Sequence, residues 1–433
     1  MKKLKYIFIY VYITILLTFG FWVNFTPIPL VLDCAAIPLL FYLLLYSDGI
    51  KLNEKQTRLQ WELIIYFVGL SLILIKDLLR GTLLPRVCIL GYRDYAEFMI
   101  VGLIMNQLVS TKKDISNILK YITFLSALLC LFGVSQYIFY DHLPDSLLRV
   151  RSGETGFVFG LDELLYRPTA LFENGIVFNG IIIISSGLSF AFIMVEGFKL
   201  KYIICFLVAV IANITTCSRA SIAGSVPLYF LEFFLLRKTR FDLKSVLIVL
   251  LFITALFTFF VLSKETAVYK RMFDSSLTEQ SNSTHFETIS EAIDTIGNHI
   301  VLGIGLGTQG YDSSGSTVEK IIRDGCIFQF ALETGLPLTI LFIIVLLTIS
   351  SNSYRVMKRT NDPIIKVLCG SFVSITGYFI FSNFINSAYN AKEVFGLYWI
   401  MAGLTLWKGI DDPEDAYKEL PQEVLIQEQN PIS

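Results

Sequence analysis

The sequence "NHIVLGIGLGTQG", residues 298–310, joins a histidine to three alternating glycines at Gly303, Gly305 and Gly307. Glycine-rich loops cradle phosphate groups when they follow a strand and open a helix in a nucleotide-binding protein. Here the neighbouring segments are among the most apolar in the chain, and no Gly-Lys-Ser or Gly-Lys-Thr sequence occurs. A nucleotide loop is therefore disfavoured, and a phosphate at this motif would belong to a lipid.

Several charged or imidazole side chains lie at or beside the ends of apolar segments, where ionisable groups are costly and mark functional sites. Structural alternatives stay open for each of them. An arginine at a span end can extend to the membrane interface, Arg93 and Glu97 are spaced to pair on one helical face, and Asp324 can cap a helix. The candidates are Arg93, Arg167, Arg219, Arg271, His285, His299 and Asp324.

A second carboxylate, Glu333, follows Asp324 by nine residues. Along an unbroken helix this spacing places the two side chains on opposite faces. A catalytic pair made of Asp324 and Glu333 is therefore disfavoured, unless Gly325 breaks the helix.

The elements that must position these residues follow from composition. The chain has 433 residues, of which 54% are hydrophobic and 16% charged, against roughly 25% charged residues in soluble domains. Apolar runs of about 20 residues recur throughout, and each can cross a bilayer. The sequence predicts an all-α, polytopic membrane helical bundle over residues 1–408. The net charge of −1 carries no information on nucleic acid, and no basic cluster indicates such a partner. The seven scattered cysteines argue against disulfides and a zinc site.

About twelve transmembrane helices are expected, the first an uncleaved anchor rather than a signal peptide. Lysines and arginines are dense in alternate short links, which predicts that both termini are cytoplasmic. Two large loops, about 141–170 and 264–323, then face outward, and residues 409–433 form a disordered acidic cytosolic tail. The expected spans are 6–24, 28–47, 61–79, 86–109, 115–140, 171–195, 201–218, 220–236, 243–263, 324–350, 363–388 and 392–408.

Four segments in this order are similar to a known family. They are "YRPTALFENG" (166–175), "TTCSRASIAG" (215–224), "SNSTHFE…AIDTIGNHIVLGIGLGT" (281–308) and "RDGCIFQFALETGLPLTILF" (323–342). Their order and spacing resemble the O-antigen ligase/O-antigen polymerase superfamily, mainly over residues 160–350. The resemblance implies a GT-C-like membrane fold and transfer of a glycan from an undecaprenyl-pyrophosphate carrier to an acceptor hydroxyl, in an inverting step without metal or other cofactor.

The resemblance also assigns roles to the candidate residues. Arg167 and Arg219 match the family's arginines and would hold the pyrophosphate, because guanidinium groups bind phosphate at two points. Asp324 replaces the histidine of the ligases, which favours a polymerase and makes Asp324 the best candidate base, with His299 and His285 as further catalytic candidates. His285 stands where a third family arginine is expected, so Arg271 is its possible substitute, and Arg93 is a further pyrophosphate-binding candidate.

The resulting prediction is a polymerase of lipid-linked oligosaccharide repeats for O-antigen, capsule or exopolysaccharide. It would act at the outer face of a bacterial inner membrane, within the lipid bilayer, beside a flippase and a chain-length regulator. The alternatives are a ligase that moves finished glycan to lipid A core or another acceptor, and a non-enzymatic glycolipid transporter or flippase.

Overall fold

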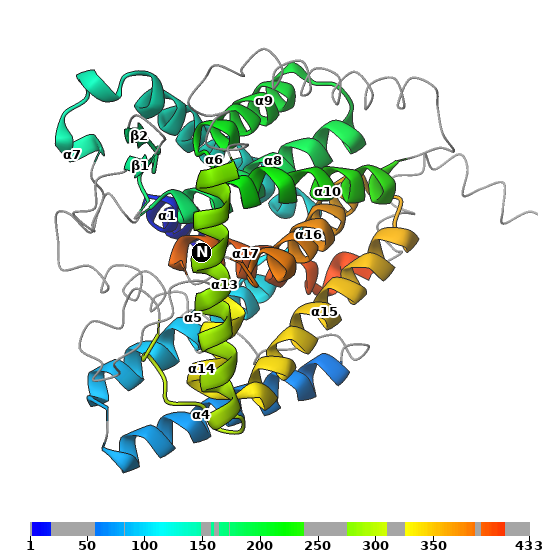
Figure 1. Cartoon of the computed structure of the whole chain (residues 1–433). Coiled ribbons are helices and arrows are strands. Elements are labelled where there is room, and N and C mark those ends of the chain that lie inside the picture. The colour runs from blue at the N-terminus through cyan, green and yellow to red at the C-terminus, as the bar shows by residue number, and fades with distance from the viewer. Residues whose placement is uncertain are drawn as a thin grey trace, which may run out of the picture.

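A computed structural model describes most of the chain as helices that pack side by side (Figure 1). The described residues are 2–18, 57–81, 83–148, 157–159, 164–172, 174–237, 275–309, 325–385 and 391–411. The long helices in these ranges are α1 (Lys2–Leu17), α4 (Thr57–Arg80), α5 (Pro85–Leu108), α6 (Lys112–Ile138), α8 (Gly175–Glu196), α9 (Leu200–Thr215), α10 (Arg219–Leu236), α13 (Ser275–Asn298), α14 (Cys326–Thr334), α15 (Leu336–Arg359), α16 (Pro363–Ser382) and α17 (Lys392–Thr405). The prediction of a helical bundle is confirmed.

The remaining elements are short. A one-turn helix, α7 (Asp145–Leu148), and an antiparallel pair of three-residue strands, β1 (Phe157–Phe159) and β2 (Leu164–Tyr166), lie between α6 and α8. Two 3-10 turns, Tyr140–His142 and Lys408–Asp411, follow α6 and α17. The strand pair is a small exception to the all-α prediction, and it lies inside the predicted loop 141–170.

Five of the described helices are long and apolar enough to cross a membrane, namely α6, α8, α10, α15 and α16. The apolar stretches Tyr6–Leu17 of α1 and Leu200–Thr215 of α9 are shorter. Helices α4 and α5 coincide with the predicted spans 61–79 and 86–109, but they are not among the five helices that are apolar enough to cross a membrane. The predicted spans 28–47 and 243–263 fall outside the described residues, so the total of twelve stays a prediction.

Local sequence explains where several of these helices begin. Thr111 and Asp114 form a capping box at the start of α6, in which each side chain accepts a backbone N–H of the other residue. Asn174 accepts the first free N–H groups of α8, Ser218 does so for α10, and Asp362 does so for α16 just before Pro363. These polar residues lie at the boundaries of the apolar runs, where side-chain acceptors stabilise exposed helix N-termini.

Close contacts fix the directions of the helices. An added Cβ at Gly180 would lie 2.5 Å from Val394, near the starts of α8 and α17, and one at Gly102 would meet the Trp399 carbonyl where α5 runs beside α17. With Lys392 near Asp94, these contacts make α5 and α17 parallel and place the start of α8 beside the start of α17. We call the end of the bundle that contains Arg167, Arg219 and the N-termini of α8 and α10 the arginine end.

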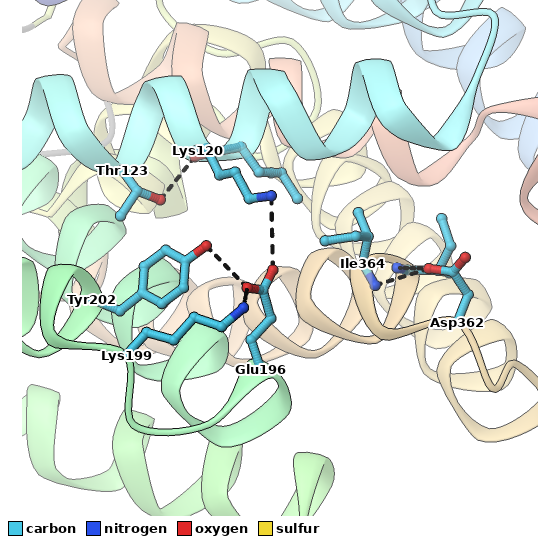
Figure 2. Close-up of polar contacts among 9 residues, drawn as sticks. Lys120, Thr123, Glu196, Lys199, Tyr202, Asp362 and Ile364 are labelled. Atoms are coloured by element: carbon cyan, nitrogen blue, oxygen red, sulfur yellow. Dashed lines mark hydrogen bonds and ion pairs between the residues drawn. The ribbon is translucent and has the colours of Figure 1, made fainter.

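The opposite end carries lysines, and we call it the lysine end; it contains Lys112, Lys120 and Lys199. Figure 2 shows Glu196, at the end of α8, between Lys199 at 2.6 Å and Lys120 of α6 at 3.9 Å, with the Tyr202 hydroxyl donating to it at 3.2 Å. Lys112 of α6 also lies 3.7 Å from Asp362, which caps α16. Ion pairs therefore join α6, α8, α9 and α16 at this end.

Three predicted boundaries are corrected. The expected unbroken helix 324–350 is broken at Gly335, whose φ of 83° and ψ of 164° lie outside the helical region, and this separates α14 from α15. The predicted loop 264–323 contains the 24-residue helix α13. The sequence did not reveal this helix, since its apolar residues are too sparse to resemble a membrane span. The packed core extends past residue 408, since Ile410 is buried in the turn Lys408–Asp411; residues 412–433 of the predicted tail lie beyond the described part.

Candidate functional site at the arginine end

Arg167 lies in the segment between β2 and α8 and packs against the start of α8. An added Cβ at Gly175 would lie 2.5 Å from Nε of Arg167, so only a glycine leaves room for this guanidinium group. The side chain is partly buried. Next to it, the Tyr166 ring stacks on Tyr140 at the end of α6, with 5.8 Å between centroids. Arg167 is thus held on a packed corner rather than on a free loop.

Gln136 of α6 fastens the same corner. Its fully buried side chain donates from Nε2 to the carbonyls of Leu147 and Ala170 at 2.6 and 2.9 Å, and its Oε1 accepts the Ala170 N–H at 2.7 Å. One amide therefore satisfies three backbone groups of the connection that precedes α8. Buried polar networks of this kind rigidify the backbone that they join.

Arg219 is the first residue of α10 and follows a tight corner. Asn213, near the end of α9, accepts from Ser221 at 2.7 Å and donates to Ser225 at 3.4 Å. Nη1 of Arg219 is buried and has no hydrogen-bond partner among the described residues. A buried, unsatisfied donor costs about 1–3 kcal/mol, so this nitrogen is available to an anion.

Both corners contain a strained residue. Among the described residues, Ala170 with φ 50° and Cys217 with φ 53° are the non-glycine residues of positive φ. This conformation is uncommon for residues with a Cβ, and such strain clusters at active sites and ligand clamps. Ala170 lies three residues after Arg167, and Cys217 lies two residues before Arg219. The strain therefore falls on the two segments that carry the predicted arginines.

The two arginines lie at the same end of the bundle. Phe190 and Phe192 of α8 pack on Phe206 and Tyr202 of α9, so α9 is antiparallel to α8. Phe206 also packs on Tyr229 of α10 while Asn213 accepts from Ser221, so α10 is antiparallel to α9. Helices α8 and α10 therefore run in the same direction, and both present their N-termini at the arginine end. Helix N-termini carry partial positive charge, which adds to the attraction of the guanidinium groups for an anion.

The C-terminal end of α16 links Arg219's helix to α14. Tyr378 of α16 lies against Gly224 of α10 and interacts with Ser221. Five residues further along α16, the carbonyl of Asn383 accepts the Ile327 N–H of α14 at 3.3 Å, and the Phe384 ring packs edge-on against Phe328. Asp324 lies outside the described residues; its neighbour Gly325 is the N-cap residue of α14.

The structure does not bring His299 to this corner. His299 is exposed and follows α13, whose residues Ala292 and Ile296 pack against Ala331 and Leu332 of α14. The carbonyl of Ile300 accepts the Leu336 N–H at 2.8 Å, so His299 lies near the C-terminal end of α14. Nine helical residues, about 13 Å, separate that end from Gly325. His285 lies on α13 without a described side chain, and Arg271 belongs to a segment that the structure does not describe.

Arg93 belongs to a charge cluster between α5 and α17. Its Nη2 lies 3.1 Å from Asp94 and its Nε lies 3.7 Å from Glu97, while Lys392 of α17 lies 3.9 Å from Asp94. The spacing of Arg93 and Glu97 correctly predicts an ion pair. Since Arg93 is already neutralised by two carboxylates, the described contacts favour the structural interpretation over binding of pyrophosphate.

The glycine motif packs into the bundle instead of forming an open phosphate loop. Gly303, Gly305 and Gly307 have φ of 60°, 129° and 74°. An added Cβ at Gly303 would meet the backbone of Glu333, and one at Gly307 would meet the carbonyl of Val87 on α5. Glycine is required both for the positive φ and for the close backbone approach. The segment is therefore wedged between α5 and α14.

Two buried carboxylates hold the backbone of this segment. Asp77 of α4 accepts the Leu306 N–H at 2.9 Å, and Glu333 of α14 accepts the Gln309 N–H at 2.6 Å. Lys76 lies 2.9 Å from Asp77 and donates to the Leu302 carbonyl at 2.8 Å. Glu333 thus faces the glycine motif, and α14 with its nine residues is too short to span a membrane. Burial raises the pKa of Glu333 to about 8, against the hydrogen bonds from Gln309 and Tyr95, which lower it.

Sequence reasoning missed Gln136, Asp77 and Lys392. Each lies with one polar neighbour inside or beside an apolar run, as in "FGVSQYIFY" and "LILIKDLLR". Their place in such a run was the available signal, because a polar side chain there is costly unless it meets a partner. The partner itself lies far along the chain in every case, so the sequence does not reveal what the side chain contacts.

Comparison with known protein families and with curated proteins finds no match to this chain.

Proposed function

We propose that this protein is a membrane glycosyltransferase that polymerises oligosaccharide repeat units carried on undecaprenyl pyrophosphate. Its products would be surface polysaccharides such as O-antigen, capsule or exopolysaccharide. The site would lie at the arginine end and would face the outside of a bacterial inner membrane, with both termini in the cytoplasm. A flippase would deliver the substrate, and a chain-length regulator would act on the product.

One observation carries the proposal most directly. Arg167 and Arg219 lie on two strained corners at the starts of two helices that run in the same direction, α8 and α10. Two guanidinium groups and two helix N-termini at one end of the bundle suit a ligand with dense negative charge, such as a pyrophosphate. The lysines of the opposite end support the proposed sidedness, because basic residues concentrate on the cytoplasmic side.

The chemistry that these groups would perform is a single displacement. The acceptor hydroxyl oxygen attacks the anomeric carbon of the donor sugar, and the bond from that carbon to the pyrophosphate oxygen breaks. The leaving pyrophosphate gains negative charge, which Arg167 and Arg219 would stabilise more strongly in the transition state than in the bound substrate. The hydroxyl proton would pass to a base, for which Asp324, beside the N-cap of α14, is the proposed residue.

The described contacts rank the other candidates. His299 is exposed and lies near the C-terminal end of α14, away from Gly325 at its start, so it is a weaker candidate for proton transfer than Asp324. Arg93 is paired with Asp94 and Glu97 and is a weaker candidate for phosphate than Arg167 or Arg219. Roles for His285 and Arg271 stay open within the proposal.

Reconstitution tests the proposal. The full chain in lipid receives only the organism's own undecaprenyl-pyrophosphate repeat unit, and the products are separated by length on a gel. We expect a ladder of increasing lengths. One-step transfer that requires lipid A core or another added acceptor would identify a ligase instead, and movement of intact substrate across vesicles without a new glycosidic bond would identify a transporter.

Conservative variants in the same assay test the roles of the arginines. We expect Arg167→Lys and Arg219→Lys to lose the ladder while they remain folded in the membrane, because lysine cannot make the two-point contact. Arg237→Lys, which changes the arginine after α10 at the other end of that helix, is the matched control and should retain the ladder. Full activity in both Arg167→Lys and Arg219→Lys would rule out the proposed two-point binding of pyrophosphate by these arginines.

A further inference from the structure

Two exposed arginines that the proposed chemistry does not use, Arg80 and Arg86, flank the short link between α4 and α5. Arg80 is the last residue of α4 and Arg86 is the second residue of α5, so only residues 81–84 lie between the two helices. Neither arginine has a hydrogen bond or an ion pair with another described residue. Both guanidinium groups are therefore available to a partner outside the chain.

Contacts between α4 and α5 bring the two arginines to one place. The Tyr66 hydroxyl donates to the Tyr95 carbonyl at 3.5 Å, and the hydroxyls of Ser71 and Tyr92 lie 3.2 Å apart. Residue numbers rise along α4 as they fall along α5, so the two helices are antiparallel neighbours (Figure 1). Because α5 begins at the arginine end, the link 81–84 and its two flanking arginines lie at that end.

Exposed apolar side chains surround these arginines. Leu79 is 83% exposed, Leu84 is 60% exposed and Val301 is 64% exposed. Val301 lies here because the carbonyl of its neighbour Leu302 accepts from Lys76 of α4 at 2.8 Å. Exposed apolar surface next to polar groups marks a site of interaction with a protein or a membrane. We call Leu79, Arg80, Leu84, Arg86 and Val301 the arginine lip.

The arginine lip stands on packed backbone. Leu83 of the link is buried, and an added Cβ at Gly305 would lie 2.6 Å from its side chain. Asp77, one turn before the end of α4, accepts the Leu306 N–H at 2.9 Å. The link and the end of α4 are therefore both held on the glycine motif, so the lip has a defined position in the fold.

The charge at the arginine lip is positive. The charged residues in the last two turns of α4 and the first turn of α5 are Lys76, Asp77, Arg80 and Arg86. Lys76 and Asp77 form an ion pair at 2.9 Å and offset each other. The remaining positive charge lies on the two exposed guanidinium groups, which match phosphate oxygens in two-point contacts.

An exposed apolar stripe on α4 leads away from the lip. Val68, Leu72, Ile75 and Leu79 are all exposed and are spaced by four, three and four residues, which places them on one face of the helix. A phosphate group at the lip and a hydrocarbon chain along this stripe would together satisfy both surfaces. That combination of charge and apolar surface is the one that an anionic lipid offers.

We infer that the arginine lip binds an anionic phospholipid from the membrane leaflet at the arginine end. The phosphate of the headgroup contacts Arg80 and Arg86, and an acyl chain lies along the stripe of α4. A zwitterionic lipid binds less tightly, because its own ammonium group competes with the arginines for the phosphate. This inference does not depend on the proposed function, since it requires neither a glycan nor a transfer reaction.

Fluorescence quenching in lipid nanodiscs tests the site. The full chain with Ile75→Cys carries a thiol-linked dye on the stripe, in nanodiscs of phosphatidylcholine that contain a small fraction of lipid with a nitroxide on its acyl chain. We expect nitroxide phosphatidylglycerol to quench half of the signal at a mole fraction about tenfold lower than nitroxide phosphatidylcholine does. Equal quenching by the two lipids, or quenching by neither, would overturn the inference.

Paired arginine variants in the same assay test the contacts. Arg80→Gln combined with Arg86→Gln should abolish the preference for phosphatidylglycerol. Arg355→Gln combined with Arg359→Gln is the matched control and should keep it, because these exposed arginines lie near the end of α15, at the lysine end. A preference that persists without Arg80 and Arg86 would refute the lip as the binding site.

Two further measurements use the labelled chain with its arginines intact. The preference should weaken as salt concentration rises, because salt screens exposed charges, and a preference that does not respond to salt would refute an ionic contact. Unlabelled phosphatidylglycerol should relieve the quenching. If undecaprenyl pyrophosphate relieves it at a much lower mole fraction, the occupant is the carrier lipid, and the assignment to a phospholipid is wrong.

Discussion

Single polar side chains organise backbone far from them in sequence. Gln136 holds the corner that carries Arg167, and Asp77 and Glu333 hold the glycine motif. Each acts as an acceptor or donor for backbone groups that no helix or strand satisfies. Their value lies mainly in avoiding unsatisfied buried amides, since losing one partner costs about 1–3 kcal/mol.

Glu333 makes stability depend on pH. Its pKa lies above the ordinary value of 4.5, at about 8, because the side chain is buried. The folded state therefore binds this proton more tightly than the unfolded state, and the stabilisation is complete below pH 4.5 and is lost as pH rises through about 8. We expect the thermal midpoint of the wild type to fall across this window and that of Glu333→Gln to fall less.

Thermal unfolding in detergent, followed at several pH values, measures this difference. Glu287→Gln is the matched control, because Glu287 lies on the exposed face of α13. The control should keep the slope of the wild type. Identical slopes for wild type and Glu333→Gln would show that another group causes the pH dependence.

At the scale of elements, the glycine motif is a packing device. Gly307→Ala places a Cβ at φ 74° against the Val87 carbonyl, and we expect a loss of about 2 kcal/mol or more from the left-handed conformation and the overlap together. Gly297→Ala is the matched control, since a Cβ there meets nothing within 4 Å on α13, and it should leave stability unchanged or raise it. Chemical denaturation of the two variants provides the comparison, and equal stability would contradict the packing role.

Helix positions were predictable, whereas breaks and polar partners were not. Apolar runs located the helices that begin near Pro85, Lys112, Gly175 and Pro363, because burial of apolar side chains dominates there. The break at Gly335 depends on a close approach to the backbone of Ile300 and Val301, which only the folded chain reveals. Arg167 and Arg219 were chosen from the sequence and share one end of the bundle, but His299 does not join them, because α13 docks at the other end of α14.

At the scale of the whole molecule, charge and helix direction define two ends. If the lysine end is cytoplasmic, a cysteine that replaces Phe198, exposed in the link between α8 and α9, should be protected from a membrane-impermeant maleimide in intact cells. A cysteine that replaces Ser283, exposed on α13, should be labelled. The described native cysteines are all buried and should contribute little background.

Permeabilised cells supply the control for this labelling. Both engineered cysteines should react once the reagent reaches both sides of the membrane. Labelling of residue 198 but not of residue 283 in intact cells would reverse the proposed orientation. It would also place the arginine end in the cytoplasm, where the proposed transfer reaction has no surface polysaccharide to extend.

The glycine contacts have a consequence for how this sequence can change over evolution. Gly102 and Gly403 bring the backbones of α5 and α17 together, and Gly91 and Gly307 do the same for α5 and the glycine motif. An added methyl group at any of them would overlap main-chain atoms, whereas an exposed leucine or isoleucine has no such constraint. In distantly related proteins, these glycines and the spacing between them should therefore stay conserved after most of the surrounding residues have changed. Their spacing would then identify a relative that overall sequence identity no longer reveals.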